Sequence, residues 1–73
     1  MSRRKRQKKM ILDYMQGGGW ISPTEAYILC GSMKLATRIS ELIADGHQIQ
    51  KQRVSDPEGS YHMEYRLSDG SAN

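Results

Sequence analysis

Residues 32–46 read SMKLATRISELIADG, which is the pattern of one amphipathic helix. Four aliphatic side chains recur at helical spacing and therefore lie on one side of the helix: Leu35, Ile39, Leu42 and Ile43. The other side carries polar groups: Lys34, Thr37, Arg38 and Glu41. Ser32 is placed to cap the start of this helix, and Gly46 is placed to end it. The stretch predicts a helix with one buried face and one polar, cation-bearing face.

A second helix is predicted just before this one. Residues 22–25, Ser-Pro-Thr-Glu, combine a capping serine, a proline at the first helical position and a glutamate that completes a capping box. We expect the helix to run to about Leu29 and to end at Gly31, with Ala26, Leu29 and Cys30 turned inward. Two capped helices joined by a tight turn are thus expected.

A further helix is predicted at the N-terminal side. It begins within the basic run and continues to about Gln16, where residues 17–19, three glycines, end it because they lose the most backbone entropy on becoming helical. Three apolar residues are expected to face inward from this helix: Ile11, Leu12 and Met15.

The C-terminal half predicts a β-hairpin. Residues 47–54 and 61–67 look extended, and residues 56–59, Asp-Pro-Glu-Gly, supply a turn between them. Trp20 and Ile21 are expected to form a short strand that pairs with this hairpin, and Trp20 and Tyr65 are expected in the core. One face of the second strand is apolar: Tyr61, Met63, Tyr65 and Leu67.

Charge is unevenly distributed along the 73 residues, whose net charge is +3. Residues 1–9 hold six of the eleven basic residues and no acid, while the other residues carry five basic and eight acidic side chains, a balance of −3. A cationic arm of this kind favours a polyanionic partner, because each cation near phosphates releases counterions. The plainer interpretation is a solvated tail that aids solubility.

The composition argues against several classes of protein. Cys30 is the single cysteine, so neither a disulfide framework nor a cysteine zinc site is expected, and a reduced cytoplasmic setting is favoured. The apolar run at residues 10–12 is too short for a signal peptide or a membrane span. We interpret His47 and His62 as ordinary strand residues and expect no metal, no cofactor, no small-molecule substrate and no enzymatic activity.

Three segments are therefore expected. Residues 1–9 form a basic arm that is either flexible or extends the first helix, and residues 10–67 form the folded domain. Residues 68–73 are small and polar and predict a disordered tail.

Two short motifs of the chain are similar to those of a known family of domains. The run ISPTEA at residues 21–26 and the run LATRISEL at residues 35–42, followed by Gly46 and Ile49, resemble the small winged helix-turn-helix domain of phage and prophage proteins over residues 8–67. The resemblance implies an α+β fold of three helices and a small antiparallel sheet with a hairpin wing. It also implies DNA binding, as a regulator of transcription or an accessory factor of recombination.

The chain departs from the common helix-turn-helix pattern at two positions. Tyr27 stands where a small residue is usual, and Thr37 stands where an aliphatic residue is usual. The turn between the two helices is therefore expected to be built differently.

Candidate DNA contacts follow from this arrangement. A recognition helix enters the major groove with its first turns toward the bases, which selects Ser32, Lys34, Thr37 and Arg38. On the wing, Lys51 and Arg53 point to one side and are candidates for phosphate contact, with Gln48, Gln50 and Gln52 on the other side. The arm contributes six candidates for backbone contact: Arg3, Arg4, Lys5, Arg6, Lys8 and Lys9.

Some alternatives stay open at this point. Arg38 either contacts a guanine or pairs with a carboxylate of Glu25, Glu41 or Glu64. The acidic tip, Asp56 and Glu58, would repel phosphates. One small module discriminates poorly among genomic sites, so we expect a homodimer or a cooperative array on double-stranded DNA, in the cytoplasm with the nucleoid. The rival hypotheses are a protein-interaction module and an RNA binder led by the arginine-rich arm.

Overall fold

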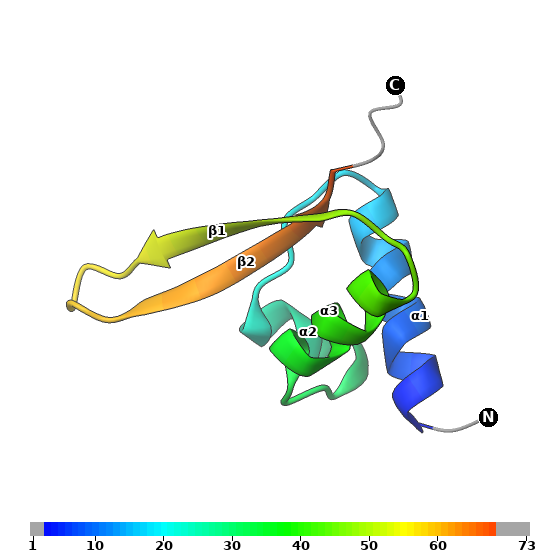
Figure 1. Ribbon diagram of the computed structural model, residues 1–73. Coiled ribbons are helices and arrows are strands. Elements are labelled where there is room, and N and C mark those ends of the chain that lie inside the picture. Colours follow the sequence, from blue (N-terminus) through cyan, green and yellow to red (C-terminus); the bar gives the residue numbers. More distant parts are fainter. Residues whose placement is uncertain (1–2, 69–73) are drawn as a thin grey trace.

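Figure 1 shows the computed structural model of the chain, in which residues 3–68 are described. Three helices are followed by a two-stranded antiparallel hairpin: α1 (Arg3–Gln16), α2 (Pro23–Cys30), α3 (Leu35–Ala44), β1 (Ile49–Ser55) and β2 (Tyr61–Leu67). The three helices gather under one end of the hairpin, and the other end projects past them as a wing (Figure 1). The predicted architecture of three helices and an antiparallel hairpin is confirmed.

The element bounds differ from the sequence predictions in instructive ways. α1 begins at Arg3, so residues 3–9 extend the first helix, which is one of the two alternatives left open for the basic arm. β1 begins at Ile49, two residues later than expected. Ile21 forms only an isolated bridge to Tyr65, with backbone N–H to oxygen distances of 2.8 and 3.1 Å, so the expected short strand is reduced to one pairing. Ser68, the first residue of the predicted tail, donates its backbone N–H to the backbone oxygen of Gln48 (2.9 Å), and residues 69–73 lie outside the described residues.

The core lies where the three helices meet the base of the hairpin. Its buried members come from every element except β1: Ile11, Met15, Ile21, Ala26, Leu35, Ile39, Leu42 and Tyr65. The expectation that Ile43 joins them is wrong, because this residue keeps 43% of its surface exposed. Ile43 lies on the margin of the apolar stripe of α3. Trp20 is likewise only half-buried, and its ring lies 4.9 Å from the guanidinium carbon of Arg66.

The predicted capping box at the start of α2 is confirmed. The backbone N–H of Glu25 donates to Ser22 Oγ (3.1 Å), and the backbone N–H of Ser22 donates to Glu25 Oε1 (2.9 Å). The same carboxylate accepts a hydrogen bond from the Tyr14 hydroxyl through Oε2 (3.0 Å). This bond raises the pKa of Tyr14, because the neutral hydroxyl is the form that donates. The cap therefore fixes the start of α2 and ties it to α1.

Replacing Ser22 by alanine is expected to destabilise the domain by about 1 kcal/mol, because an N–H at the helix start loses its acceptor. In a domain of this size that loss corresponds to a decrease of roughly 4–8 °C in Tm, measured by circular dichroism. Ser40→Ala is the matched control, since Ser40 is exposed within α3 and alanine is a better helix former. Equal Tm values for the two variants would contradict a stabilising cap.

The turn between α2 and α3 is built on a left-handed glycine. Gly31 has φ 75° and ψ 14°, and its N–H donates to the backbone oxygen of Tyr27 (2.8 Å). Ser32 then folds inward and is buried, so α3 begins at Leu35 with Lys34 at its N-cap and no side-chain cap. The predicted capping role of Ser32 is wrong, because its hydroxyl accepts from the Lys34 N–H (3.3 Å), just ahead of the helix.

Candidate nucleic-acid interface

The outward face of α3 is exposed along its length. Leu35, Ile39 and Leu42 are buried on the inner side, which leaves four residues of the N-terminal half on the surface: Lys34, Ala36, Thr37 and Ser40. After Lys34 these side chains are small and uncharged, so another molecule can approach the helix backbone closely. Ser40 was not among the predicted contacts, although its spacing of three from Thr37 places it on the same face.

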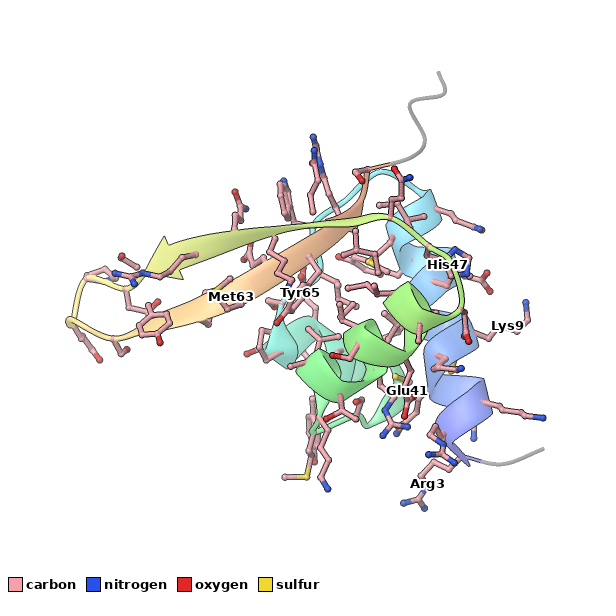
Figure 2. All side chains as sticks on the ribbon, in the orientation of Figure 1. Arg3, Lys9, Glu41, His47, Met63 and Tyr65 are labelled. Carbon is pink, nitrogen blue, oxygen red and sulfur yellow. The ribbon has the colours of Figure 1, made fainter. Side chains whose placement is uncertain are left out.

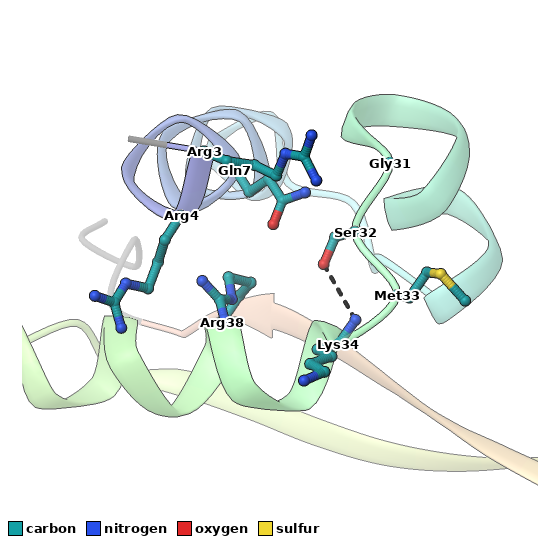
Figure 3. Close-up of a pocket in the computed structure, with 8 residues that line it drawn as sticks. All are labelled: Arg3, Arg4, Gln7, Gly31, Ser32, Met33, Lys34 and Arg38. Atoms are coloured by element: carbon teal, nitrogen blue, oxygen red, sulfur yellow. Dashed lines mark hydrogen bonds between the residues drawn. The ribbon is translucent and has the colours of Figure 1, made fainter. Parts of the chain in front are cut away.

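Two predicted contacts do not lie on this face. Ser32 is 2% exposed, because the turn buries this residue and does not present it on the outward face of α3. The Arg38 side chain is 12% exposed, and one of its terminal nitrogens lies 3.4 Å from Glu41 Oε1 on the next turn of α3. Arg38 thus forms the carboxylate pair that the sequence left open, and it lies on the side of α3 that faces α1 (Figure 3).

The basic segment is divided by its position on α1. Arg3 lies at the end of α1 farthest from the hairpin (Figure 2), and Arg3 and Arg4 border the same hollow as Lys34 and Arg38 of α3. Arg6 borders a neighbouring groove beside α2. Sequence reasoning missed this convergence of α1 and α3 because it depends on how the two helices pack.

The later cations of α1 are paired within the chain. Lys8 Nζ lies 2.8 Å from Asp45 Oδ2, and Lys9 Nζ lies 3.4 Å from Asp13 Oδ2 on the same helix. Lys5 is exposed and borders a hollow that Asp45 also lines. These pairs make Lys8 and Lys9 poorer candidates for phosphate contact than the cations at the start of the helix.

Two of the ion pairs give a pH dependence of stability. The hydrogen bond from Lys8 lowers the pKa of Asp45, and the hydrogen bond from His62, followed by that from Gln52, lowers the pKa of Glu64. A carboxyl whose pKa is lowered on folding stabilises the native state above its ordinary pKa and loses that contribution as pH falls. We therefore expect Tm to decrease as pH falls below the ordinary values of 4.5 for Glu64 and 3.8 for Asp45.

Asp45→Asn tests the assignment, since amide side chains do not titrate in this range. The variant is expected to lose part of the decrease in Tm below pH 3.8, the ordinary value for Asp45. Its matched control is Asp13→Asn, which removes the exposed carboxylate that pairs with Lys9 on the same helix. Parallel pH profiles for the wild type and Asp45→Asn would refute the assignment.

The hairpin register places the wing cations on the side that faces the helices. Lys51 pairs with Tyr65 and Arg53 pairs with Met63, and residues directly opposite share a face of the sheet. The prediction that Lys51 and Arg53 point to one side is confirmed by this register, and both are exposed. The guanidinium of Arg53 stacks 4.7 Å above the centre of the Tyr61 ring, which holds it along the stem of the wing.

On the other face of the hairpin, polar side chains form hydrogen bonds with one another across the two strands. Arg66 Nε donates to Gln50 Oε1 (2.7 Å), and Gln52 Nε2 donates to Glu64 Oε1 (3.0 Å), as expected for a glutamine face opposite the cations. At the tip, the Asp56 carboxylate accepts from the Ser60 hydroxyl (2.9 Å), and Glu58 is exposed. Because the acidic tip repels phosphates, the stem of the wing is the better candidate for contact with them.

Within residues 3–68, no set of three or more histidine, cysteine, aspartate or glutamate side chains is grouped to hold a metal ion. No helix in that same range has the length and apolar character needed to cross a membrane.

Comparison with known proteins adds one positive finding. The family model of the winged helix-turn-helix domain matches residues 6–69, which is most of the chain. No curated protein and no solved structure gives a significant match. The matched range includes α1 from residue 6 onward, all of α2 and α3, and the whole hairpin.

Proposed function

This chain belongs to the winged helix-turn-helix family, and from that membership we propose that it binds double-stranded DNA with α3 in the major groove and the wing on the backbone. Domains of this family suggest DNA binding in general. The observation that carries the proposal is the exposed outer face of α3, which no other element of residues 3–68 covers. A major groove accepts one α-helix, and the small side chains of this face permit a close fit.

The cations surround that face. Lys34 lies at the start of α3, where a recognition helix meets base edges, and Lys51 and Arg53 lie on the helix-facing side of the wing. A duplex that lies along α3 and beside the projecting hairpin meets both groups. Lys34 and Thr37 are assigned to the groove, and the wing cations are assigned to phosphates, which position the protein but read no sequence.

The finer role that we propose is that of a small regulator of transcription, or of a recombination accessory factor, in a phage or prophage. The basic segment of α1 and the small number of residues available for base contacts support this role. Because one module contacts few bases, we infer that two or more copies bind together on the duplex.

The test measures binding of a labelled duplex by fluorescence anisotropy at several salt concentrations. Each phosphate contact contributes about 0.9 to the slope of log K against log salt, so Lys51→Gln is expected to reduce the slope by about one. Lys9→Gln removes the same charge from a residue paired with Asp13 and is the matched control, with a smaller expected change. Failure to form any complex at low ionic strength would overturn the proposal.

The fragments that the protein selects from its parent genome separate the finer roles. Sites beside promoters support a transcriptional regulator, and clustered repeats beside an attachment site support a recombination factor. An RNA hairpin that competes as well as the duplex would favour the RNA-binding alternative instead.

A second candidate function is supported by an apolar surface beside α2. Ile28 and Met33 are 77% and 85% exposed, and together with Tyr27 they line a groove next to Arg3 and Arg6. Exposed apolar groups gathered in this way are typical of protein contacts. If Ile28→Ser lowers the Hill coefficient of duplex binding, the surface joins copies of this chain. If the wild type binds the duplex without cooperativity, the surface does not join copies on DNA, and the hypothesis that it binds another protein is favoured.

A further inference from the structure

A pocket of about 430 Å³ lies between the first turn of α1, the turn after α2 and the start of α3. Figure 3 shows its walls, with Arg3, Arg4 and Gln7 on α1 facing Lys34 and Arg38 on α3. Gly31, Ser32 and Met33 of the turn complete the lining. The pocket therefore joins the N-terminal ends of two helices that are far apart in the sequence.

The lining is strongly cationic. Four of the eight residues that line the pocket are arginine or lysine, and none of the eight is acidic. The nearest acidic partner is Glu41, which stands 3.4 Å from Arg38 and 3.7 Å from Arg4 at the closest atoms. Charge-assisted hydrogen bonds between such groups are about 2.7–2.9 Å long, so one carboxylate holds both guanidinium groups loosely. The pocket keeps an excess of positive charge.

Arg38 has hydrogen-bonding capacity that the chain leaves unused. Its Nε is buried and has no hydrogen-bond partner among residues 3–68, and Glu41 Oε1, which lies 3.4 Å from a terminal nitrogen of the same guanidinium, also has none. Buried polar groups are satisfied in most proteins, and an exception calls for an explanation. In Figure 3 this side chain lies between α3 and α1, in the space that Arg4 borders from the other side. An oxygen of an anion placed there would supply the acceptor.

The start of α3 adds a second positive feature. Its N-cap is Lys34, with no side-chain cap, and the first N–H groups of a helix have no partner within the helix. Such an end carries a partial positive charge that favours anions. Here it opens beside the pocket, because Lys34 is both the N-cap and part of the lining.

We propose that this pocket binds a phosphate group and that, on the basis of the proposed function, the group is a backbone phosphate of the duplex contacted by α3. Lys34 belongs to both the pocket and the exposed face of α3, so a strand that meets Thr37 passes the mouth of the pocket. A free phosphate ion presents the same oxygens. The experiment therefore measures the ion and the duplex separately.

In the first measurement, inorganic phosphate is titrated into the free protein and the ¹H–¹⁵N NMR spectrum is recorded. The ionic strength is kept constant, and chloride is the reference anion. Saturable shifts are expected for the Arg38 Nε–H and for the backbone N–H groups of residues 34–37. Arg38→Gln is expected to remove these shifts. Because Arg38 is largely buried, Arg3→Gln on the exposed end of α1 is a second variant that preserves the core and should weaken the shifts.

The second measurement titrates a duplex with the same variants. Arg38→Gln and Arg3→Gln are each expected to weaken duplex binding and to reduce the salt slope, with a decrease of about one for Arg38→Gln. Lys51→Gln is the matched control, because it should weaken duplex binding without changing the response to inorganic phosphate. Unchanged Tm values verify that the variants are folded.

The outcomes distinguish this proposal from the proposed function. Phosphate shifts that saturate while Arg38→Gln leaves duplex affinity and slope unchanged would overturn the assignment to the DNA backbone. Absence of phosphate shifts together with an unchanged duplex response would overturn the pocket altogether. Phosphate shifts that Arg38→Gln removes, in a protein that binds no duplex, would support the anion pocket but refute DNA binding and thus the backbone assignment.

Discussion

Thr37→Glu is expected to weaken duplex binding by roughly 10- to 100-fold, which corresponds to about 1.4–2.7 kcal/mol. Thr37 lies on the exposed face of α3, within its first turn, where the helix is expected to meet base edges. A carboxylate at this position faces the phosphates on both sides of the groove and replaces a small side chain by a longer one. Both effects oppose docking.

The fold should tolerate this substitution well. Glutamate is a better helix former than threonine, and a negative charge in the first turn of a helix interacts favourably with its positive end. Tm is therefore expected to stay constant or rise slightly. Gln16→Glu is the matched control, because it adds the same charge at the opposite end of α1, about 20 Å along that helix from Arg3. Similar affinities for the two variants, by fluorescence anisotropy, would show that α3 does not enter the groove.

Ile39→Ala is expected to destabilise the domain by about 2–5 kcal/mol, because it removes buried methyl groups and leaves a cavity. Ile39 is among the most deeply buried side chains and lies at the centre of the α3 stripe, between Leu35 and Leu42. A domain of 73 residues has a total stability of roughly 4–11 kcal/mol. The variant is therefore expected to be partly unfolded at physiological temperature, and chemical denaturation measures the loss.

Ile43→Ala provides the same chemical change four residues further along α3. Because Ile43 keeps 43% of its surface exposed and lies at the margin of the core, this variant is expected to lose about 1 kcal/mol or less. The contrast between the two variants separates burial from helix propensity. A loss at position 43 as large as that at position 39 would mean that the side of α3 assigned to solvent is covered in solution.

The local features of this fold could be predicted from the sequence. The spacing of Leu35, Ile39 and Leu42 sets the inner face of α3, and the Ser-Pro-Thr-Glu run sets the start of α2. Alternation places Lys51 and Arg53 on one side of the wing. Each of these depends on residues a few positions apart, where helical or strand geometry fixes the outcome.

The remaining errors concern contacts between distant segments. The turn that buries Ser32 depends on how α2 and α3 each pack against α1, and Ile43 lies at the margin of the buried stripe, where local spacing does not decide exposure. The pairing of Lys8 with Asp45 joins residues 37 positions apart, so no local pattern reports it. The anion pocket is of the same kind, since α1 and α3 build it together.

The hairpin is fastened to the domain at one end. Tyr65 and its bridge to Ile21 hold the inner half of β2 against the helices, whereas Tyr61 and Arg53 lie further out along the wing. A two-stranded ribbon gains little stability by itself in water, so its outer half can bend at small energetic cost while the inner half stays fixed. In the proposed complex, the wing can therefore adjust to local differences in groove width without shifting α3, so that adjustment to DNA shape and contact with the bases are carried by different elements.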